Sequence, residues 1–309
     1  MPERKLPNKG KVGKTSLACY TLPLKLSSSE AGRTIVRGIA FQGERGAFSE
    51  EAASYLFPDH PMLPKPSFAD VFAAVQVGDA DFGVVPVENS TAYSVNESYE
   101  LLVEYQGRLF PRGEYDLHVQ QCLMALPGQR LEDIHTVQSH PQALAQSREF
   151  LEALPVQIVP VYDTAGSAKL VREGELRGVA GIASRRAAAI YDLDVLAENI
   201  QTNKDNYTRF LIIGHEEVPA QAGGKTSVVF VVRDQPGSLF RALAAFAIHE
   251  VNVSRLESRP IRGRTWEYLF HANLEGHHDD PDVAAALSAL ARCTQMLKVI
   301  GSYPRLTPP

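Results

Sequence analysis

Cysteine, tryptophan and long hydrophobic runs are all scarce in this sequence of 309 residues. The three cysteines, Cys19, Cys122 and Cys293, show neither metal-ligand nor disulfide spacing, which favours a reducing compartment. No apolar run approaches the roughly 20 residues that a membrane span needs. The net charge of -5 offers nothing to a polyanionic partner. We therefore expect a cytoplasmic protein that binds neither membrane nor nucleic acid.

What is present is an ordinary globular composition, with 44% hydrophobic and 22% charged residues, in a chain long enough for two domains. Residues 1–34 differ, because they are basic and end in a Ser-rich patch. The apolar stretch 17–24 is a poor secretory signal, since threonine and proline interrupt it and a lysine follows. The segment 9–15 lacks the first glycine of a phosphate-binding loop, because Asn8 stands there. We expect residues 1–34 to be a disordered extension, or to result from a start site that was assigned too far upstream.

From residue 35 to about residue 214, short apolar runs alternate with amphipathic stretches, which predicts an α/β architecture with largely parallel sheets. The expected strands are 35–43, 81–88, 118–126, 134–139, 156–163, 178–184 and 208–214. The expected helices are 48–56, 68–77, 95–105, 142–154, 165–172 and 185–191. We assign residues 35–216 to this first domain.

Residues 217–225 have the Pro, Gly and Gln content of a linker, and the pattern changes after them. The order that follows is β-α-β-β-α-β, with strands at 227–232, 251–258, 265–275 and 296–304 and helices at 236–249 and 281–291. This order predicts a ferredoxin-like α+β fold, and residues 226–305 have the length of one small domain.

Several strands of the first domain end in hydroxyl or amide residues that open a helix, at 43–49, 88–90, 139–142, 163–164 and Ser184. Helix N-termini at the carboxyl ends of strands suit anions, so together they predict a small polyanion such as a dicarboxylate. Taken singly, each Ser or Thr at these junctions is better explained as a helix cap, and Ser139 with Gln142 fits a capping box. The scattered histidines show no metal-ligand spacing.

Several stretches between Ile39 and Pro304 follow one another in an order and spacing typical of one family. In the first domain they are FQGERGAFSEEAA (41–53), GVVPVENS (83–90), SHPQALAQ (139–146), DTAGSAKLV (163–171), IASRRAAAIYDLDVLAENIQ (182–201) and NYTRFLII (206–213). In the second they are KTSVVFVV (225–232), DQPGSLFRALAAFA (234–247), SRLESRP (254–260) and GSYP (301–304). The chain thus resembles a prephenate dehydratase with a C-terminal ACT regulatory domain. The resemblance implies a two-lobed domain of the periplasmic-binding-protein-like type II, followed by a ferredoxin-like ACT domain.

The resemblance implies an enzyme that converts prephenate to phenylpyruvate, with loss of carbon dioxide and the ring hydroxyl, in L-phenylalanine biosynthesis. Aromatisation drives this reaction, so no cofactor and no metal are expected. The threonine of the family's T-R-F motif, here Thr208, would assist departure of the hydroxyl by hydrogen bonding. Arg209 would either pair with a substrate carboxylate or point away from it, because neighbouring side chains alternate along a strand.

The resemblance also implies a set of substrate-binding residues around the cleft. They are Asn89, Ser90, Ser139, Gln142, Gln146, Thr164 and Arg209. One departure is Tyr93, which stands where family members usually carry glycine. Its bulk leaves open whether the substrate is prephenate or its amino analogue arogenate. A non-catalytic amino-acid sensor is a further alternative, but a sensor would not need the hydroxyl of Thr208.

For the second domain, the resemblance implies an allosteric site for phenylalanine as feedback inhibitor. The implied residues are Gly237, Ser238, Leu239, Asn252, Glu257, Ser258, Arg259 and Pro260. A helix N-terminus behind Gly237 suits the carboxylate of an amino acid, and Asn252 with backbone carbonyls suits its ammonium group. ACT domains of this kind pair edge to edge, so we expect a homodimer or a homotetramer.

Overall fold

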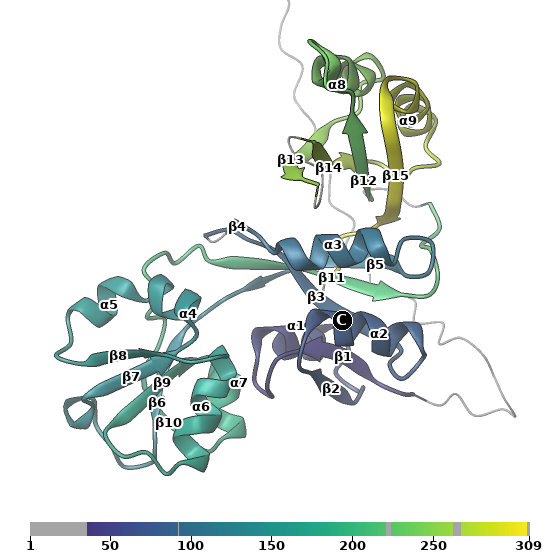
Figure 1. Cartoon of the computed structure of the whole chain (residues 1–309). Coiled ribbons are helices and arrows are strands. Elements are labelled where there is room, and N and C mark those ends of the chain that lie inside the picture. The colour runs from purple at the N-terminus through teal and green to yellow at the C-terminus, as the bar shows by residue number, and fades with distance from the viewer. Residues whose placement is uncertain (1–35, 92, 221–223, 262–266, 308–309) are drawn as a thin grey trace, which may run out of the picture.

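The computed structural model describes residues 36–91, 93–220, 224–261 and 267–307 of the chain. Three β-sheets organise these residues: two form the lobes of the first domain and the third belongs to the C-terminal unit (Figure 1). The expectation for residues 1–34 falls outside this described part. Within it, no helix is long and apolar enough to cross a membrane.

The first lobe is built on a sheet of order β2-β1-β3-β11-β5, with the short β4 paired to β3. Its strands are β1 (Ile39–Gln42), β2 (Met62–Lys65), β3 (Phe82–Asn89), β4 (Tyr93–Ser94), β5 (Phe110–His118) and β11 (Tyr207–Gly214). Its helices are α1 (Phe48–Leu56), α2 (Phe68–Gln76) and α3 (Asn96–Glu104). Apolar side chains of β3 and β11 are buried on both faces of the sheet, because α1 packs on one face and α2 with α3 on the other.

The second lobe has a sheet of order β10-β6-β9-β7-β8. Its strands are β6 (Cys122–Ala125), β7 (Thr136–Ser139), β8 (Gln157–Pro160), β9 (Val179–Ala183) and β10 (Asp194–Ala197). Its helices are α4 (Pro141–Gln146), α5 (Arg148–Glu152), α6 (Thr164–Glu173) and α7 (Arg185–Ile190), with a 3-10 turn at Leu131–Asp133. The chain crosses between the lobes twice, from β5 to β6 and from β10 to β11, so the predicted two-lobed architecture is confirmed.

The expectation of largely parallel sheets is wrong for the strands next to the crossings. The pairs β3–β11, β11–β5, β6–β9 and β6–β10 are antiparallel, since the returning chain runs back along the lobe that it left. Strand β5 is absent from the strands expected above, because Pro111, Gly113 and three charged residues interrupt its apolar pattern. The helix expected at 142–154 is divided at Ser147 into α4 and α5.

The C-terminal unit has the predicted ferredoxin-like order, in a sheet β13-β14-β12-β15. Its elements are β12 (Lys225–Val232), α8 (Ser238–Ile248), β13 (Val253–Pro260), β14 (Tyr268–Glu275), α9 (Pro281–Cys293) and β15 (Thr294–Tyr303). Helices α8 and α9 cover one face of this sheet. The other face packs on α3 of the first lobe, where Tyr99 and Leu102 share a core with Val229, Ile300 and Tyr303 (Figure 1). The first lobe and the C-terminal sheet thus share one continuous core.

Candidate active site

The side chains of Thr208 and Asn89 lie together at the end of the β3–β11 ladder. The two residues are cross-strand partners, and the Asn89 Nδ2 donates a hydrogen bond of 2.9 Å to the Thr208 Oγ1. Asn89 is 6% exposed, whereas Thr208 is half-buried at the point where the second crossing enters the first lobe. Their pairing brings together two residues that the sequence analysis assigned separately to catalysis and to substrate binding.

Backbone groups define the orientation of the Asn89 amide. Its Oδ1 accepts a hydrogen bond of 3.0 Å from the backbone N–H of Thr91, and its Nδ2 donates to the carbonyl of Tyr207 at 3.2 Å. The Thr208 oxygen is therefore an acceptor toward Asn89, and its own proton points elsewhere. Among the described residues, no group accepts that proton. The Thr208 hydroxyl is consequently available as a donor to a bound molecule.

A network of amides supports this pair from the second lobe. The Asn89 Nδ2 also donates to Asn206 Oδ1 at 2.9 Å, and Asn206 Nδ2 donates to Gln146 Oε1 at 3.3 Å. Gln146 on α4 donates to Thr91 Oγ1 at 3.0 Å and accepts from Gln121 at 3.2 Å. The network therefore spans both crossings and both lobes, and it holds Asn89 in place.

The sequence indicated Gln146 as a site residue but did not indicate Thr91, Gln121 or Asn206. Asn206 is 1% exposed and Gln121 is 2% exposed. The available signal was the position of Gln121 and Asn206. Each stands in a polar segment just before a strand, β6 or β11, that the chain enters after crossing between the lobes. Without knowledge of the crossings, such segments look like ordinary loops.

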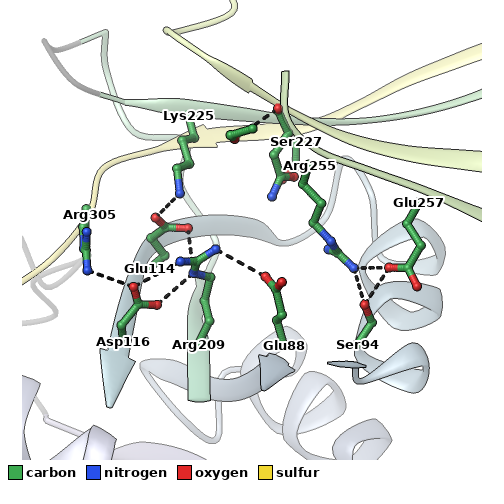
Figure 2. Close-up of polar contacts among 12 residues, drawn as sticks. Glu88, Ser94, Glu114, Asp116, Arg209, Lys225, Ser227, Arg255, Glu257 and Arg305 are labelled. Atoms are coloured by element: carbon green, nitrogen blue, oxygen red, sulfur yellow. Dashed lines mark hydrogen bonds and ion pairs between the residues drawn. The ribbon is translucent and has the colours of Figure 1, made fainter. Parts of the chain in front are cut away.

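Arg209 lies on the face of β11 opposite to Thr208. Its Nε and Nη2 donate to the two oxygens of Asp116 at 2.8 and 3.1 Å, and its Nη1 donates to Glu88 at 3.3 Å (Figure 2). Since alternate side chains of a strand point to opposite faces, Arg209 cannot share the site with Thr208. Of the two expectations for this residue, the structure therefore supports the one in which it points away.

The hydroxyls of two other residues expected to bind substrate, Ser139 and Ser90, already have hydrogen-bond partners within the fold. Ser139 is fully buried, and its hydroxyl donates to the carbonyl of Ile182 at 2.7 Å. Ser90 donates to the carbonyl of Asp205 and accepts from the N–H of Tyr207, both at 2.9 Å, so it braces the second crossing. These two hydroxyls therefore have structural roles, because their hydrogen bonds hold neighbouring strands and the crossing in place.

The predicted capping box at Ser139 is also wrong. Helix α4 begins at Pro141, its N-cap is His140, and the Nδ1 of His140 accepts from the backbone N–H of Gln142 at 3.2 Å. Asp163 and Ser184 cap α6 and α7 in the same way, by accepting from Gly166 and Ala187. The cap interpretation therefore holds at the starts of α6 and α7, whereas at α4 the capping side chain is His140 instead of Ser139.

Two cavities adjoin the junction of the lobes, and Thr208 lines neither of them. One of about 550 Å³ is bounded by Thr91, Gln142, Gln146 and Asn206, and so adjoins the network around Thr208. The other, of about 400 Å³, lies between residues 42–44, residues 64–66 and the pair 162–163. Burial and the nearby Glu44 raise the pKa of the Asp163 carboxyl in this second cavity. Thr164 follows Asp163 and is half-buried at the start of α6.

A family model for prephenate dehydratase matches residues 39–218, and one for the ACT domain matches residues 226–292. Arogenate dehydratase/prephenate dehydratase 2, chloroplastic, of Arabidopsis thaliana is 38% identical, with 92% of this chain and 78% of that relative covered. The chain belongs to the prephenate dehydratase family. This is a family of carbon–oxygen lyases in aromatic amino acid biosynthesis, so the predicted family is confirmed.

Two solved structures are similar to this chain over most of their length. The enzyme from Arthrobacter aurescens, in complex with L-Phe, has a TM-score of 0.79 and 32% identity, covering 88% of this chain and 91% of that chain. GqqA, described as a novel type of quorum quenching acylase, has a TM-score of 0.80 and 36% identity, covering 86% of this chain and 97% of that chain. The two-lobed domain with a C-terminal ACT domain is therefore common to these proteins.

The structure divides the predicted effector residues of the ACT domain into two groups. Gly237, Ser238 and Leu239 line a cavity of about 740 Å³ at the N-terminus of α8, where Gly237 adopts a φ of 77°. Asn252 lies beyond the other end of α8. Glu257 accepts a hydrogen bond of 2.6 Å from Ser94 of the first domain (Figure 2). Within one chain, the two predicted motifs therefore do not form a single site.

The Glu257 carboxylate is also paired with the guanidinium groups of Arg255 and Arg259 on its own strand. Burial alone would raise the pKa of this carboxyl, but the hydrogen bond from Ser94 and the two arginines outweigh burial and lower it. Ser258 and Pro260 are exposed on the opposite face of the same edge strand. In this arrangement Glu257 and Arg259 face the first domain, while Ser258 and Pro260 remain open to a neighbour.

Proposed function

We propose that the chain is a prephenate dehydratase that forms phenylpyruvate from prephenate. The observation that carries this proposal is the Thr208 hydroxyl, which accepts from Asn89 and whose own proton has no acceptor among the described residues. This O–H would donate to the ring hydroxyl of the substrate as that group leaves. The electrons of the bond to the departing carboxylate move into the ring, carbon dioxide is released, and the hydroxyl departs as water after taking a proton that solvent replaces.

Asn89, Gln142, Gln146 and Thr164 remain proposed substrate ligands. Gln142 and Gln146 line the cavity of about 550 Å³, Asn89 bonds Thr208, and Thr164 follows Asp163 of the cavity of about 400 Å³. Ser90, Ser139 and Arg209 are not among them, for the reasons given above. Arogenate is the rival substrate, because the first relative carries both enzyme names. The phenol of Tyr93, on which this choice was expected to depend, lies outside the described side chains. No group in this mechanism requires a cofactor or a metal.

Phenylalanine is the proposed effector of the ACT domain. A relative of known structure holds L-Phe, and the cavity beside Gly237 has a helix N-terminus suited to a carboxylate. In a homodimer or homotetramer, the exposed side of β13 with Ser258 and Pro260 would reach the cavity of a second chain. We propose residues 35–216 as the catalytic domain, 217–225 as the linker, 226–305 as the regulatory domain, and the cytoplasm as the location.

The test is product formation from prephenate and from arogenate by the wild type, Thr208→Ala and Thr208→Ser. Thr208→Ala should lower kcat about a hundredfold with little change in KM, because only a transition-state hydrogen bond is lost. Thr208→Ser retains the hydroxyl and should keep most of the activity. Turnover of one substrate only would identify it. A wild type that is inactive on both substrates would refute the enzymatic function and leave the amino-acid sensor as the remaining hypothesis.

A further inference from the structure

Six charged side chains form a compact cluster on the side of the sheet that faces the ACT domain (Figure 2). The acids are Glu88, Glu114 and Asp116, and the bases are Arg209, Lys225 and Arg305. The acids and Arg209 belong to the catalytic domain. Lys225 opens β12 and Arg305 follows β15, so two of the three bases come from the ACT side.

Burial of the acids raises the free-energy cost of losing these ion pairs. The Glu114 side chain is 1% exposed, with Lys225 bound to its Oε1 and the Arg209 Nε 3.6 Å from its Oε2. A buried carboxylate that loses one of its cations is left with a large desolvation penalty. Lys225 at the start of β12 therefore supplies a positive charge that compensates the buried Glu114 side chain.

Asp116 is held by both domains in a similar way. It accepts two hydrogen bonds from Arg209 and one of 2.9 Å from Arg305. Burial alone would raise the pKa of the Asp116 carboxyl, but Arg209, with Arg305 and Lys225, outweighs burial and lowers it. The carboxylate is thus ionised and shared between a residue of the ACT side and the neighbour of Thr208.

The backbone of the C-terminal tail binds the same stretch of β5. The N–H of Glu114 donates to the carbonyl of Pro304 at 2.9 Å, and the N–H of Leu306 donates to the carbonyl of Glu114 at 2.7 Å. Leu306 packs over Gly113, where an added Cβ would lie 2.4 Å from its side chain. Any shift of β12 and β15 relative to the first lobe therefore moves β5 and its two acids together.

From this chain of contacts we propose that Arg209 is a positioning residue that links the placement of the ACT domain to the placement of Thr208. Arg209 pairs with Glu88 across the ladder, and the next rung is the pair of Thr208 and Asn89. A position of the ACT domain that withdraws Lys225 and Arg305 removes their ion pairs with Glu114 and Asp116. The two acids then hold Arg209 less firmly, and the hydroxyl of Thr208 is displaced. The inference rests on the proposed function, because the group that is placed is the proposed catalytic one.

The test uses the full chain with Lys225→Gln and Arg305→Gln combined, since neither side chain reaches the cleft. Arg292→Gln is the matched control, because Arg292 is exposed on α9 and has no ion pair within the described residues. The double variant should lose roughly tenfold in kcat with KM within about twofold, as expected for a displaced catalytic group. Its inhibition by phenylalanine should also shrink, because coupling between two sites is reciprocal. Activity and inhibition equal to those of the control would overturn the link.

A second arm separates positioning from direct binding of substrate. Arg209→Gln and Asp116→Asn should each lower kcat, and together they should lose no more than either alone, because they break the same contact. A rise in KM for Arg209→Gln without any effect of the Lys225 and Arg305 changes would mean that Arg209 binds substrate instead. If the Arg209 variant does not fold, Arg305→Gln alone decides, since its side chain is 51% exposed and its removal leaves the core intact.

A readout independent of activity distinguishes this inference from the proposed function. Hydrogen exchange of the peptide around residues 207–209 should be faster in the Lys225 and Arg305 double variant than in the Arg292 control. Faster exchange together with an inactive wild type would keep the link and refute the dehydratase. Unchanged exchange in an active enzyme would refute the link alone.

Discussion

At the scale of single residues, the direction of one hydrogen bond determines what Thr208 can do. The two N–H groups of the Asn89 Nδ2 are shared among three acceptors within hydrogen-bond distance: the carbonyl of Tyr207, the side-chain oxygen of Asn206 and the hydroxyl of Thr208. An amide presents both a donor and an acceptor, whereas a carboxylate only accepts. We therefore expect the amide of Asn89 to be needed for its N–H, which leaves the Thr208 proton without an acceptor among the described residues.

Asn89→Asp tests this direction with almost no change in size. A carboxylate would accept the Thr208 proton and reverse the bond, so we expect kcat to fall by about a hundredfold. The matched control is Asn96→Asp, the same change at the exposed first residue of α3. Steady-state kinetics on the preferred substrate measures both. Retention of kcat in Asn89→Asp would mean that the orientation of the hydroxyl is irrelevant.

At the scale of elements, the loop between β1 and α1 docks directly onto α7 of the other lobe. The Ser184 hydroxyl donates to the carbonyl of Gly46 at 2.6 Å. Gly46 adopts a φ of 86°, and a Cβ added there would lie 2.6 Å from the Cα of Ala187. The glycine thus allows a backbone-to-backbone approach of the two lobes, which a side chain would prevent.

Gly46→Ala should separate the lobes locally and weaken closure around the substrate. We expect KM to rise several-fold and the free energy of unfolding to fall by about 2–4 kcal/mol, from strain at positive φ and the clash together. Gly107→Ala is the control, because Gly107 has a φ of 78° but no atom within 4 Å of an added Cβ. Denaturant unfolding and KM measure the difference. Equal effects of the two changes would show that the approach to Ala187 is unimportant.

At the scale of the whole molecule, the ACT sheet and the first lobe share an apolar interface with a histidine at its edge. The His271 ring meets the Tyr99 ring edge-on, with centroids 5.1 Å apart. The Cζ of Arg255 lies over the Tyr99 ring, 4.2 Å from its centroid. Burial, followed by the charge of Arg255, lowers the pKa of His271 from 6.5 to about 4. The neighbouring Glu257 opposes this shift but does not cancel it.

Acid should therefore destabilise the folded chain through His271. Below pH 6.5 the unfolded chain binds a proton at this residue, while the folded chain binds it only near pH 4, so stability falls as pH drops through that window. His271→Gln removes this dependence, and the loss between pH 7.5 and pH 4 should shrink by about 3 kcal/mol. Denaturant unfolding of both proteins at the two pH values measures it. Parallel profiles would show that His271 titrates normally in the fold.

The sequence predicted more of the fold than of the site. The β-α-β-β-α-β order of the ACT domain and the alternation of the first domain are local patterns, and both are confirmed. Strand β5 escaped notice because Glu114 and Asp116 resemble loop residues until Arg209, Lys225 and Arg305 are seen to neutralise them. Ser139 and Ser90 matched family positions, but their hydroxyls are used by neighbouring backbone groups that no local pattern reveals.

The sequence by itself determined most element types and the two-domain order, because strand periodicity is read from neighbouring residues. The resemblance to the family gave the candidate Thr208, and the polar end of a buried strand also indicated Asn89. Only the tertiary structure decided which face each side chain uses and what it meets. Thr208 and Asn89 stand 119 positions apart and meet only after the chain has crossed between the lobes twice. The direction of Arg209 likewise depends on acids from two other strands and on bases from another domain. Such contacts arise from packing of distant segments, which a local pattern does not contain.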